Sequence, residues 1–182
     1  EDVRVPQSQR VYEENKGWTC AKFLLAHERT GIAGVASSKR GVEKVKQIAR
    51  TELDGDKPLL ANAFFKRKIA ELEIDLAALE YTELRTLAGE AAGKGPGPES
   101  SVLKIKGTEI QQRITELALE AAGHYGAPYF RGFPKDGDNA HPIGPDFAHR
   151  AAPTYFNVRK TSIYGGSNEI QRNIIAKMVL GL

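Results

Sequence analysis

Residues 161–182 read TSIYGGSNEIQRNIIAKMVLGL, and the rest of the chain is best understood as a scaffold for this stretch. Gly165 and Gly166 follow an aromatic residue and predict a turn in which backbone can approach a ligand closely. Ser167 or Asn168 then stands at the N-cap of a helix that runs to the end of the chain. Such a turn leaves backbone N–H groups free to hold the polar part of an anionic cofactor, although an ordinary loop-to-helix joint has the same pattern. The apolar residues of this last helix recur at helical spacing: Ile170, Ile174, Ile175, Met178 and Val179.

Length and composition predict one large domain. The chain has 182 residues, of which 41% are hydrophobic and 27% charged, which suits a single core and excludes a disordered chain. The net charge of +3 comes from interspersed signs, so nothing indicates a nucleic-acid partner. No apolar run approaches the ~18 residues of a membrane span, and the N-terminus lacks a signal-peptide layout. Because a single cysteine, Cys20, also suits a reducing compartment, we expect a cytoplasmic protein.

Three helices are predicted before the last one: Trp18 to about Ala49, about Leu59 to Ala92, and from about Pro98–Ser101 to Ala122. The first contains Gly31, Gly34 and Gly41, which weaken a helix and therefore predict tight packing or binding on that face. The second helix has a bundle stripe and a second apolar stripe on another side. The two stripes are Phe65, Ile69, Leu72, Leu76 and Leu79, and Ile74, Ala77, Tyr81, Leu84 and Ala88.

Two segments lack such a period. Residues 1–16 alternate like the end of a strand and are interpreted as the remnant of a preceding β domain and its linker. Residues 123–160 carry Gly, Pro and His and are expected to be irregular, with Tyr125, Tyr129, Phe130, Phe133 and Phe147 fixing part of them and residues 136–140 mobile. The histidines are not spaced as metal ligands.

The predicted fold is therefore all-α. Residues 17–182 should form a mostly antiparallel four-helix bundle with one long irregular crossover before the last helix.

The run from Tyr164 to Ala176, YGGSNEIQRNIIA, resembles the C-terminal signature of the flavin-dependent acyl-CoA dehydrogenases. The resemblance implies a C-terminal helical bundle that follows a middle β domain, so that residues 1–6 correspond to the last strand of that domain. It also implies FAD as cofactor and an acyl-CoA substrate, which is converted to its trans-2-enoyl-CoA. An electron-transfer flavoprotein would be the acceptor.

The catalytic base is expected on the first helix. Many family members carry a Glu directly after the signature Tyr, and here that position is Gly165. Other members carry the base early in the first helix, directly before an Arg, and the run HERTGIA (residues 27–33) resembles that segment. Glu28 is thus the candidate base and Arg29 the candidate substrate contact. A carboxylate buried beside a flavin and an acyl chain has its pKa raised toward the working range; a Glu-Arg pair on a solvated helix face is the plainer interpretation.

The cofactor contacts carry over imperfectly. Gly166, Ser167 and Glu169 stand at the flavin-binding turn, with Ser where the family has Thr and Glu where Gln is common. Gly123 and Gly126 stand in a Gly-Gly-x-Gly-like turn, GHYG, with Glu120 where a Gln usually precedes it. Arg50 matches an Arg that reaches the cofactor of a neighbouring subunit, but the Phe-Gly that normally follows is absent. A carboxylate near a pyrophosphate has the wrong sign, so Glu120 or Glu169 should point elsewhere.

Two further hypotheses stay open. If Gly165 has replaced the base and Glu28 is only a surface residue, the chain is a non-catalytic partner in a mixed assembly. Alternatively it is a helical oligomerisation module, since its doubly apolar second helix indicates self-association as a dimer or tetramer. The isolated 182-residue chain is expected to be inactive, because it lacks the middle domain that would hold the flavin ring.

Overall fold

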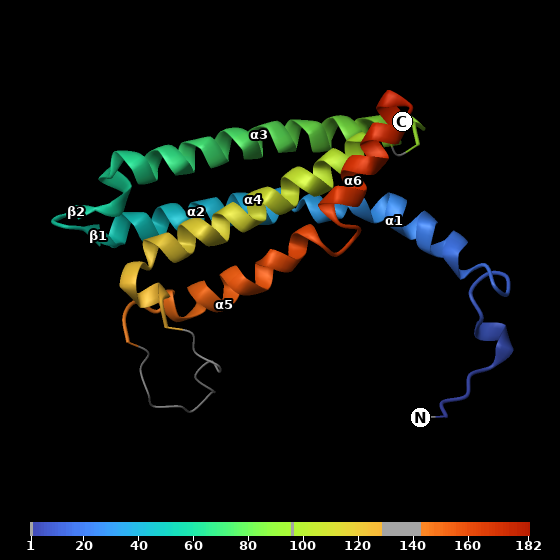
Figure 1. The fold of residues 1–182 in the computed structure, drawn as a ribbon, viewed down its shortest axis with the longest axis horizontal. Helices are drawn as coiled ribbons and strands as arrows, with labels where there is room; N and C mark the ends of the chain where they lie inside the picture. The colour runs from blue at the N-terminus through green and yellow to red at the C-terminus, as the bar shows by residue number, and fades with distance from the viewer. Residues whose placement is uncertain (1, 96, 129–142) are drawn as a thin grey trace.

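The computed structural model describes residues 2–95, 97–128 and 143–182, except for the side chains of residues 26–30. These parts contain six α-helices and one two-stranded hairpin, which confirms the all-α prediction (Figure 1). The helices are α1 (Gly17–Ala33), α2 (Val35–Thr51), α3 (Ala63–Ala91), α4 (Glu99–Ala121), α5 (Ala148–Val158) and α6 (Asn168–Ile175), which continues as a π-helical turn over Ala176–Leu180. The strands are β1 (Leu53–Asp54) and β2 (Lys57–Pro58), with Leu53 opposite Pro58 and Asp54 opposite Lys57.

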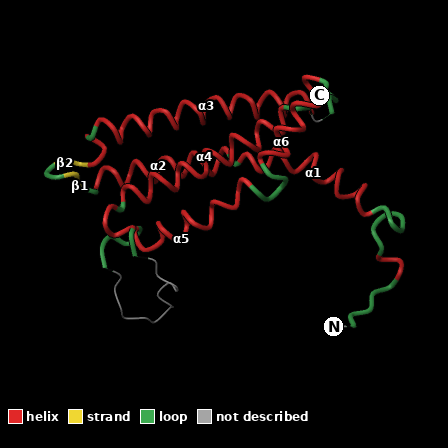
Figure 2. The backbone as a smooth tube through the Cα atoms, in the orientation of Figure 1, coloured by secondary structure: helices red, strands yellow, loops and turns green. Residues whose placement is uncertain are grey.

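Helix α4 is the centre of the bundle and contacts each of the other five α-helices. Helices α2, α3 and α5 run along its length, while α6 crosses it near its beginning (Figures 1 and 2). The α4 side chains that face these neighbours include Leu103, Ile110 and Leu117, all buried. The core therefore lies along α4, as expected when a helix is covered on several sides.

The single helix predicted for residues 18–49 is wrong, because the chain forms two helices that meet at Gly34. Gly34 has a φ of +61°, a left-handed conformation that ends α1 and precedes α2. A Cβ at Gly34 would lie 2.8 Å from the Gln111 amide nitrogen, which instead donates to the carbonyls of Ile32 and Ala33 at 3.1 and 3.5 Å. The glycine thus provides both the turn and the space for a side chain that satisfies the last carbonyls of α1.

The other two glycines of the predicted first helix behave differently. Gly41 packs against Ile114 of α4, whose Cγ2 would be 3.0 Å from an added Cβ, so the expected close packing holds there. An added Cβ at Gly31 would meet no described atom within 4 Å, so the expectation does not hold there within the described chain.

Helix α3 confirms the predicted bundle stripe and corrects the second one. It begins four residues later than predicted, after a 3₁₀ turn at Leu59–Ala61, with the Asn62 side chain accepting from the N–H groups of Phe64 and Phe65. All five residues of the bundle stripe are buried. Ile74, Tyr81 and Leu84 of the second stripe are exposed, so no described element covers that side of α3.

The irregular crossover is shorter than predicted, because residues 148–158 form α5. Its buried face consists of Ala148, Ala151 and Ala152, and Phe147 packs against the core just before it. Residues 123–126 form a 3₁₀ turn. Tyr129, Phe130, Phe133 and the 136–140 tip lie outside the described residues.

Residues 2–16 are exposed and contain one 3₁₀ turn, Gln7–Gln9. The described part of this segment contains no strand, and its assignment as a remnant of a β domain stays a prediction. Within the described ranges, no helix combines the length and apolar character needed to cross a bilayer.

Candidate functional site

The glycine turn lies directly against the end of α1. Gly165 and Gly166 have φ values of +68° and +85°, and a Cβ at Gly165 would lie 2.7 Å from Ile32 Cδ1. The Gln171 amide nitrogen donates to the carbonyls of Gly165 and Gly166 at 3.2 and 3.4 Å. The Gln171 side chain thus fixes the turn. Only glycine fits both the backbone angles of the turn and its close contact with α1.

The N-terminus of α6 holds a carboxylate of its own. Ser167 is the N-cap, as predicted, and its hydroxyl accepts from the Ile170 N–H at 3.5 Å. The backbone N–H of Glu169 and the Ser167 hydroxyl hydrogen bond to the Glu169 carboxylate and hold its pKa below the ordinary value. A helix N-terminus stabilises negative charge, so Glu169 occupies the position that an anionic cofactor group would need.

Glu28 and Arg29 lie in α1, where the backbone is helical, but their side chains are outside the described residues. Glu28 precedes Ile32 by four residues, which is about 6 Å along the helix axis. The backbone of the candidate base therefore lies one helical turn from the residue that touches the Gly165 turn.

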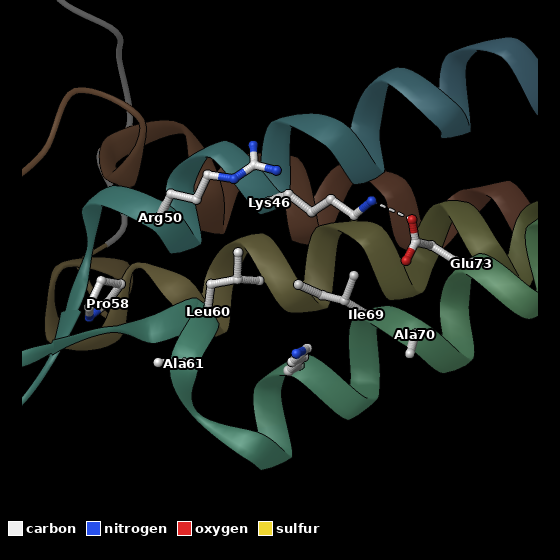
Figure 3. A pocket seen from close by; sticks show the side chains of 9 residues that line it. Lys46, Arg50, Pro58, Leu60, Ala61, Ile69, Ala70 and Glu73 are labelled. Atoms are coloured by element: carbon white, nitrogen blue, oxygen red, sulfur yellow. Dashed lines mark hydrogen bonds and ion pairs between the residues drawn. The ribbon is translucent and has the colours of Figure 1, made fainter.

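A second candidate region lies at the other end of the bundle, between the end of α2, the hairpin and the start of α3. It is an open groove of about 530 Å³ whose lining includes Arg50, Lys66, Leu60 and Ile69. Figure 3 shows Arg50, Leu60 and Ile69 around it. Among the described residues Arg50 and Lys66 have no hydrogen-bond or ion-pair partner within 4 Å, while the Arg50 charge adds to that of Lys46 in lowering the pKa of Glu43. The groove therefore combines two available cations with an apolar surface.

Lys46, also in this groove, is already paired with two carboxylates. Its ammonium pairs with Glu73 across the groove and with Glu43 at 2.9 Å on its own helix. These two hydrogen bonds, first Glu73 and then Glu43, raise the pKa of Lys46, and Lys46 in turn lowers the pKa of Glu43. Arg50 and Lys66 are the charges left to meet an anion.

The GHYG turn follows α4 at this same end. Gly123 has a φ of +53°, and a Cβ at Gly126 would lie 2.8 Å from Leu119 Cδ1. Glu120 does not face this turn as an unpaired charge, because Lys68 pairs with both of its carboxylate oxygens at 2.7 and 2.8 Å. The expectation that Glu120 points elsewhere is consistent with this ion pair.

The predicted cofactor residues thus fall into two groups. Gly166, Ser167 and Glu169 lie where α6 crosses the first half of α4, whereas Gly123 and Gly126 follow its other end and Arg50 lies in the last turn of α2. Figure 1 shows α6 and the β1–β2 hairpin after α2 at opposite ends of α4. Asn168 contacts Lys104 and Thr108 of α4, and from these residues the helix continues to Ala121 over about 20–25 Å. The two groups cannot surround one small part of a cofactor within one chain.

Both regions can be tested against the chemistry of FAD. The groove at Arg50 fits a diphosphate and an aromatic ring, because it offers unpaired cations above an apolar floor. The start of α6 suits a pyrophosphate poorly, because the negative charge of the Glu169 carboxylate lies in the first turn of that helix. The turn at Gly165–Gly166 remains suited to close approach by an uncharged ligand.

The residues that hold the turn were missed by the sequence analysis. Lys104, Thr108, Asn168 and Gln171 are buried, and none was singled out as a functional residue, although Asn168 was one of the two N-cap candidates. A signal was present on the helix from residue 99 to 121, because polar residues recur at spacings of three and four beside its apolar stripe. This polar stripe is Ser101, Lys104, Thr108, Gln111 and Thr115.

With this geometry in view, the comparison with protein families is decisive. Residues 15–180 match the family model described as acyl-CoA dehydrogenase, C-terminal domain. The chain belongs to the acyl-CoA dehydrogenase family, of which it represents the C-terminal helical domain. Members of this family are flavoproteins, which confirms FAD as the predicted cofactor at the level of the family.

Several relatives come from Mycobacterium tuberculosis. The chain is 27% identical over 185 residues to acyl-CoA dehydrogenase FadE26 and 30% identical over 185 residues to acyl-CoA dehydrogenase IpdE1, and each match covers 100% of this chain. The matches cover 44% and 42% of those two proteins, so the chain spans less than half of their length. Among solved structures, the ChsE4–ChsE5 complex from the same organism superposes with a TM-score of 0.75 at 26% identity, covering 100% of this chain and 45% of that one.

Proposed function

We propose that this chain is the C-terminal domain of a flavin-dependent acyl-CoA dehydrogenase in which Glu28 removes the α proton of an acyl-CoA. The observation that carries the proposal is the contact between Gly165 and Ile32, one helical turn from Glu28. It supports a shared pocket formed by the first helix and the C-terminal turn. The whole protein would form a trans-2-enoyl-CoA.

Glu28 would act as general base and Arg29 as a substrate contact. A carboxylate enclosed by an apolar acyl chain has its pKa raised, which suits proton abstraction near neutral pH. Gly165 places no side chain between α1 and the turn, which lets the turn approach Ile32 directly. FAD supplies the acceptor for the hydride that leaves the β carbon.

The proposed flavin contacts come from both ends of the bundle. Gly166 and Ser167 would approach the flavin at the turn. Arg50, supported by its unpaired state in the groove, would meet the phosphates of a cofactor bound to a neighbouring subunit, with Gly123 and Gly126 close to it. The distance between the two groups favours a dimer or tetramer in which each site draws on two chains.

The test is Glu28→Gln in the whole protein, scored by exchange of the substrate α proton with solvent. The amide has nearly the same shape but cannot accept the proton, so we expect exchange and turnover to fall at least about 100-fold with flavin still bound. Glu13→Gln, an exposed carboxylate upstream of α1, is the matched control and should leave both unchanged. Retained exchange in Glu28→Gln would remove Glu28 from the mechanism.

The isolated 182-residue chain should neither bind flavin stoichiometrically nor dehydrogenate acyl-CoA. The relatives are more than twice as long, and we infer that a preceding β domain encloses the flavin ring. Stoichiometric flavin and activity in the purified chain would contradict this. An electron-transfer flavoprotein is the expected acceptor of the whole enzyme.

A specific observation favours a second candidate, a non-catalytic subunit of a mixed assembly. The turn carries Gly165 where many members have the base, and Glu169 fills the anion position at α6. The flavin content of the purified assembly separates the two functions. One flavin per chain supports the enzyme, whereas one flavin per two different chains supports the partner.

A pure assembly module is the remaining alternative. Sedimentation of the 182-residue chain with and without flavin tests it, since oligomers that form without cofactor would favour assembly.

A further inference from the structure

Lys104 is a buried charged side chain near the beginning of α4. It lies on α4 with none of its surface exposed, and it is the one charged residue among the buried residues that the structure describes. Burying an ammonium is costly unless its donors are satisfied and its charge is matched. A Met or Leu would fill similar space without that cost, so stability alone does not account for a lysine here.

The ammonium reaches the first residue of α6. Lys104 Nζ donates to Asn168 Oδ1 at 2.8 Å, and the Thr108 hydroxyl lies 3.4 Å from the same oxygen. This is the hydrogen bond of Lys104 within the described residues, and its partner is neutral. Burial lowers the pKa of Lys104, and the Glu169 carboxylate opposes this change.

Asn168 is joined to the glycine turn by the helix itself. Gln171 follows Asn168 by three residues, so both face α4, and it donates to the Gly165 and Gly166 carbonyls. Asn168 is 7% and Gln171 1% exposed. The contact at Asn168 therefore sets the position of the helix start from which Gln171 holds the turn.

The same part of α4 also holds the end of α1. Gly107 lets Ala33 approach so closely that an added Cβ would lie 2.5 Å from the Ala33 carbonyl oxygen, and Gln111 donates to the Ile32 carbonyl at 3.1 Å. Residues 104–111 thus fix both sides of the contact between Ile32 and Gly165. A displacement of α6 would separate the turn from α1.

We propose that Lys104 is a positioning residue, which fixes the start of α6 through Asn168 and thereby holds the Gly165–Gly166 turn against the end of α1. This proposal rests on the proposed function only where it concerns the role of the turn in catalysis. In the enzyme, Lys104 would set the distance between the turn and the α1 segment that contains Glu28 without touching substrate.

The test is amide hydrogen exchange of residues 163–171 in the 182-residue chain, which needs neither flavin nor substrate. Lys104→Met keeps the length of the side chain and removes the charge-assisted hydrogen bond, so exchange in the turn should become about tenfold faster or more. Exchange in the α3 core around Leu72 and Leu76 reports on global folding and should change less. Lys106→Met, an exposed lysine two residues further along α4, should leave the turn unchanged.

A second variant separates positioning through Asn168 from a general loss of stability. Asn168→Ala should speed exchange in the turn as Lys104→Met does, and the double variant should be no faster than either one, because both remove the same contact. Asn168→Asp keeps the acceptor and should keep the protection. Its protection should disappear when Lys104 is replaced as well.

Unchanged exchange in a folded Lys104→Met chain, or additive effects in the double variant, would overturn the proposal. If Lys104→Met fails to fold, the Asn168 pair decides, since equal effects of Ala and Asp would also overturn it. Loss of the proposed enzyme activity would leave these exchange results standing, so the two proposals fail separately.

Discussion

Two glycines on facing sides of the bundle show how differently the same residue can be used. Gly107 lies inside α4, and a Cβ added there would lie 2.6 Å from the Cα of Ala33. Gly31 lies inside α1, and a Cβ there would meet no described atom within 4 Å. Backbone cannot move aside as a flexible side chain can. Of these two glycines, Gly107 is therefore the one that the packing of the described residues requires.

Gly107→Ala should therefore destabilise the chain by about 1–3 kcal/mol, because α1 must move away from α4. Gly31→Ala should be neutral or stabilising by up to about 1 kcal/mol, since alanine is the better helix former. Urea unfolding with a common slope would measure both. Equal stability of the two variants would show that the close approach at Ala33 is not needed.

Glu169 predicts a pH dependence at the start of α6. Hydrogen bonds from its own N–H and from Ser167 lower its folded pKa, so the unfolded chain binds the proton more readily. The stabilisation is fully present above the ordinary carboxylate pKa, and it is lost as the pH falls through the lowered folded pKa.

Glu169→Gln should make the stability of the chain less dependent on pH in that acidic window, while other carboxylates keep the remaining dependence. Thermal unfolding midpoints measured from neutral to acidic pH would show this. Glu99→Gln, at the start of α4, serves as the comparison. An unchanged acidic slope for Glu169→Gln would mean that its carboxylate does not cap α6.

At the level of elements, Arg159 joins the end of α5 to α4. Its guanidinium pairs with Glu116 at 2.7 Å, donates to the Gln112 carbonyl at 2.9 Å and lies 4.3 Å from the centre of the Tyr155 ring. The Gln112 side-chain amide in turn donates to the Arg159 carbonyl at 3.2 Å. Arg159 is therefore a polar link between the end of α5 and α4.

Arg159→Met should destabilise the chain by about 1–2 kcal/mol, reduced from the value for a fully buried charged hydrogen bond because the side chain is partly exposed. Lys160→Met, whose ammonium bonds only to Asn157 among the described residues, should change stability little. Chemical unfolding would compare the two. Similar effects of both variants would argue against a link through Arg159.

The success of the helix predictions follows from the size of the apolar side chains. Helix α3 was found because its buried residues, from Phe65 to Leu79, are large and recur at bundle spacing. Helix α5 was missed because its buried face consists of alanines and it contains Pro153, both of which resemble loop composition. The break at Gly34 was missed because a glycine inside a helical pattern can either weaken or end it.

At the scale of the whole molecule, the outer face of α3 is the candidate surface for association between chains. Ile74 and Tyr81 are both 69% exposed. They lie about two helical turns apart on a side of α3 that no described element covers. Replacing both with Glu should lower the association state seen by sedimentation and leave helix content unchanged. Lys44→Glu, on the exposed side of α2, should not alter association. Unchanged association in the double variant would locate the interface elsewhere.

The separation of the candidate site into two regions also belongs to this scale. The resemblance assigned Ser167 to the flavin-binding turn and Arg50 to the cofactor of a neighbouring subunit, and α4 separates their surroundings by about 20–25 Å along its length. This separation is consistent with sites that draw on two chains. The sequence contains both sets of residues but not the distance between them.

The sequence by itself determined the helical class, the bundle stripe of α3, the Ser167 cap and the family signature, because each depends on residues close together along the chain. Tertiary structure alone decided that Gly34 divides the first helix, that Lys104 holds Asn168 from 64 residues away, and that Ile32 meets the Gly165 turn. These contacts join residues distant in sequence, and their free energies depend on burial and distance, which no local pattern records.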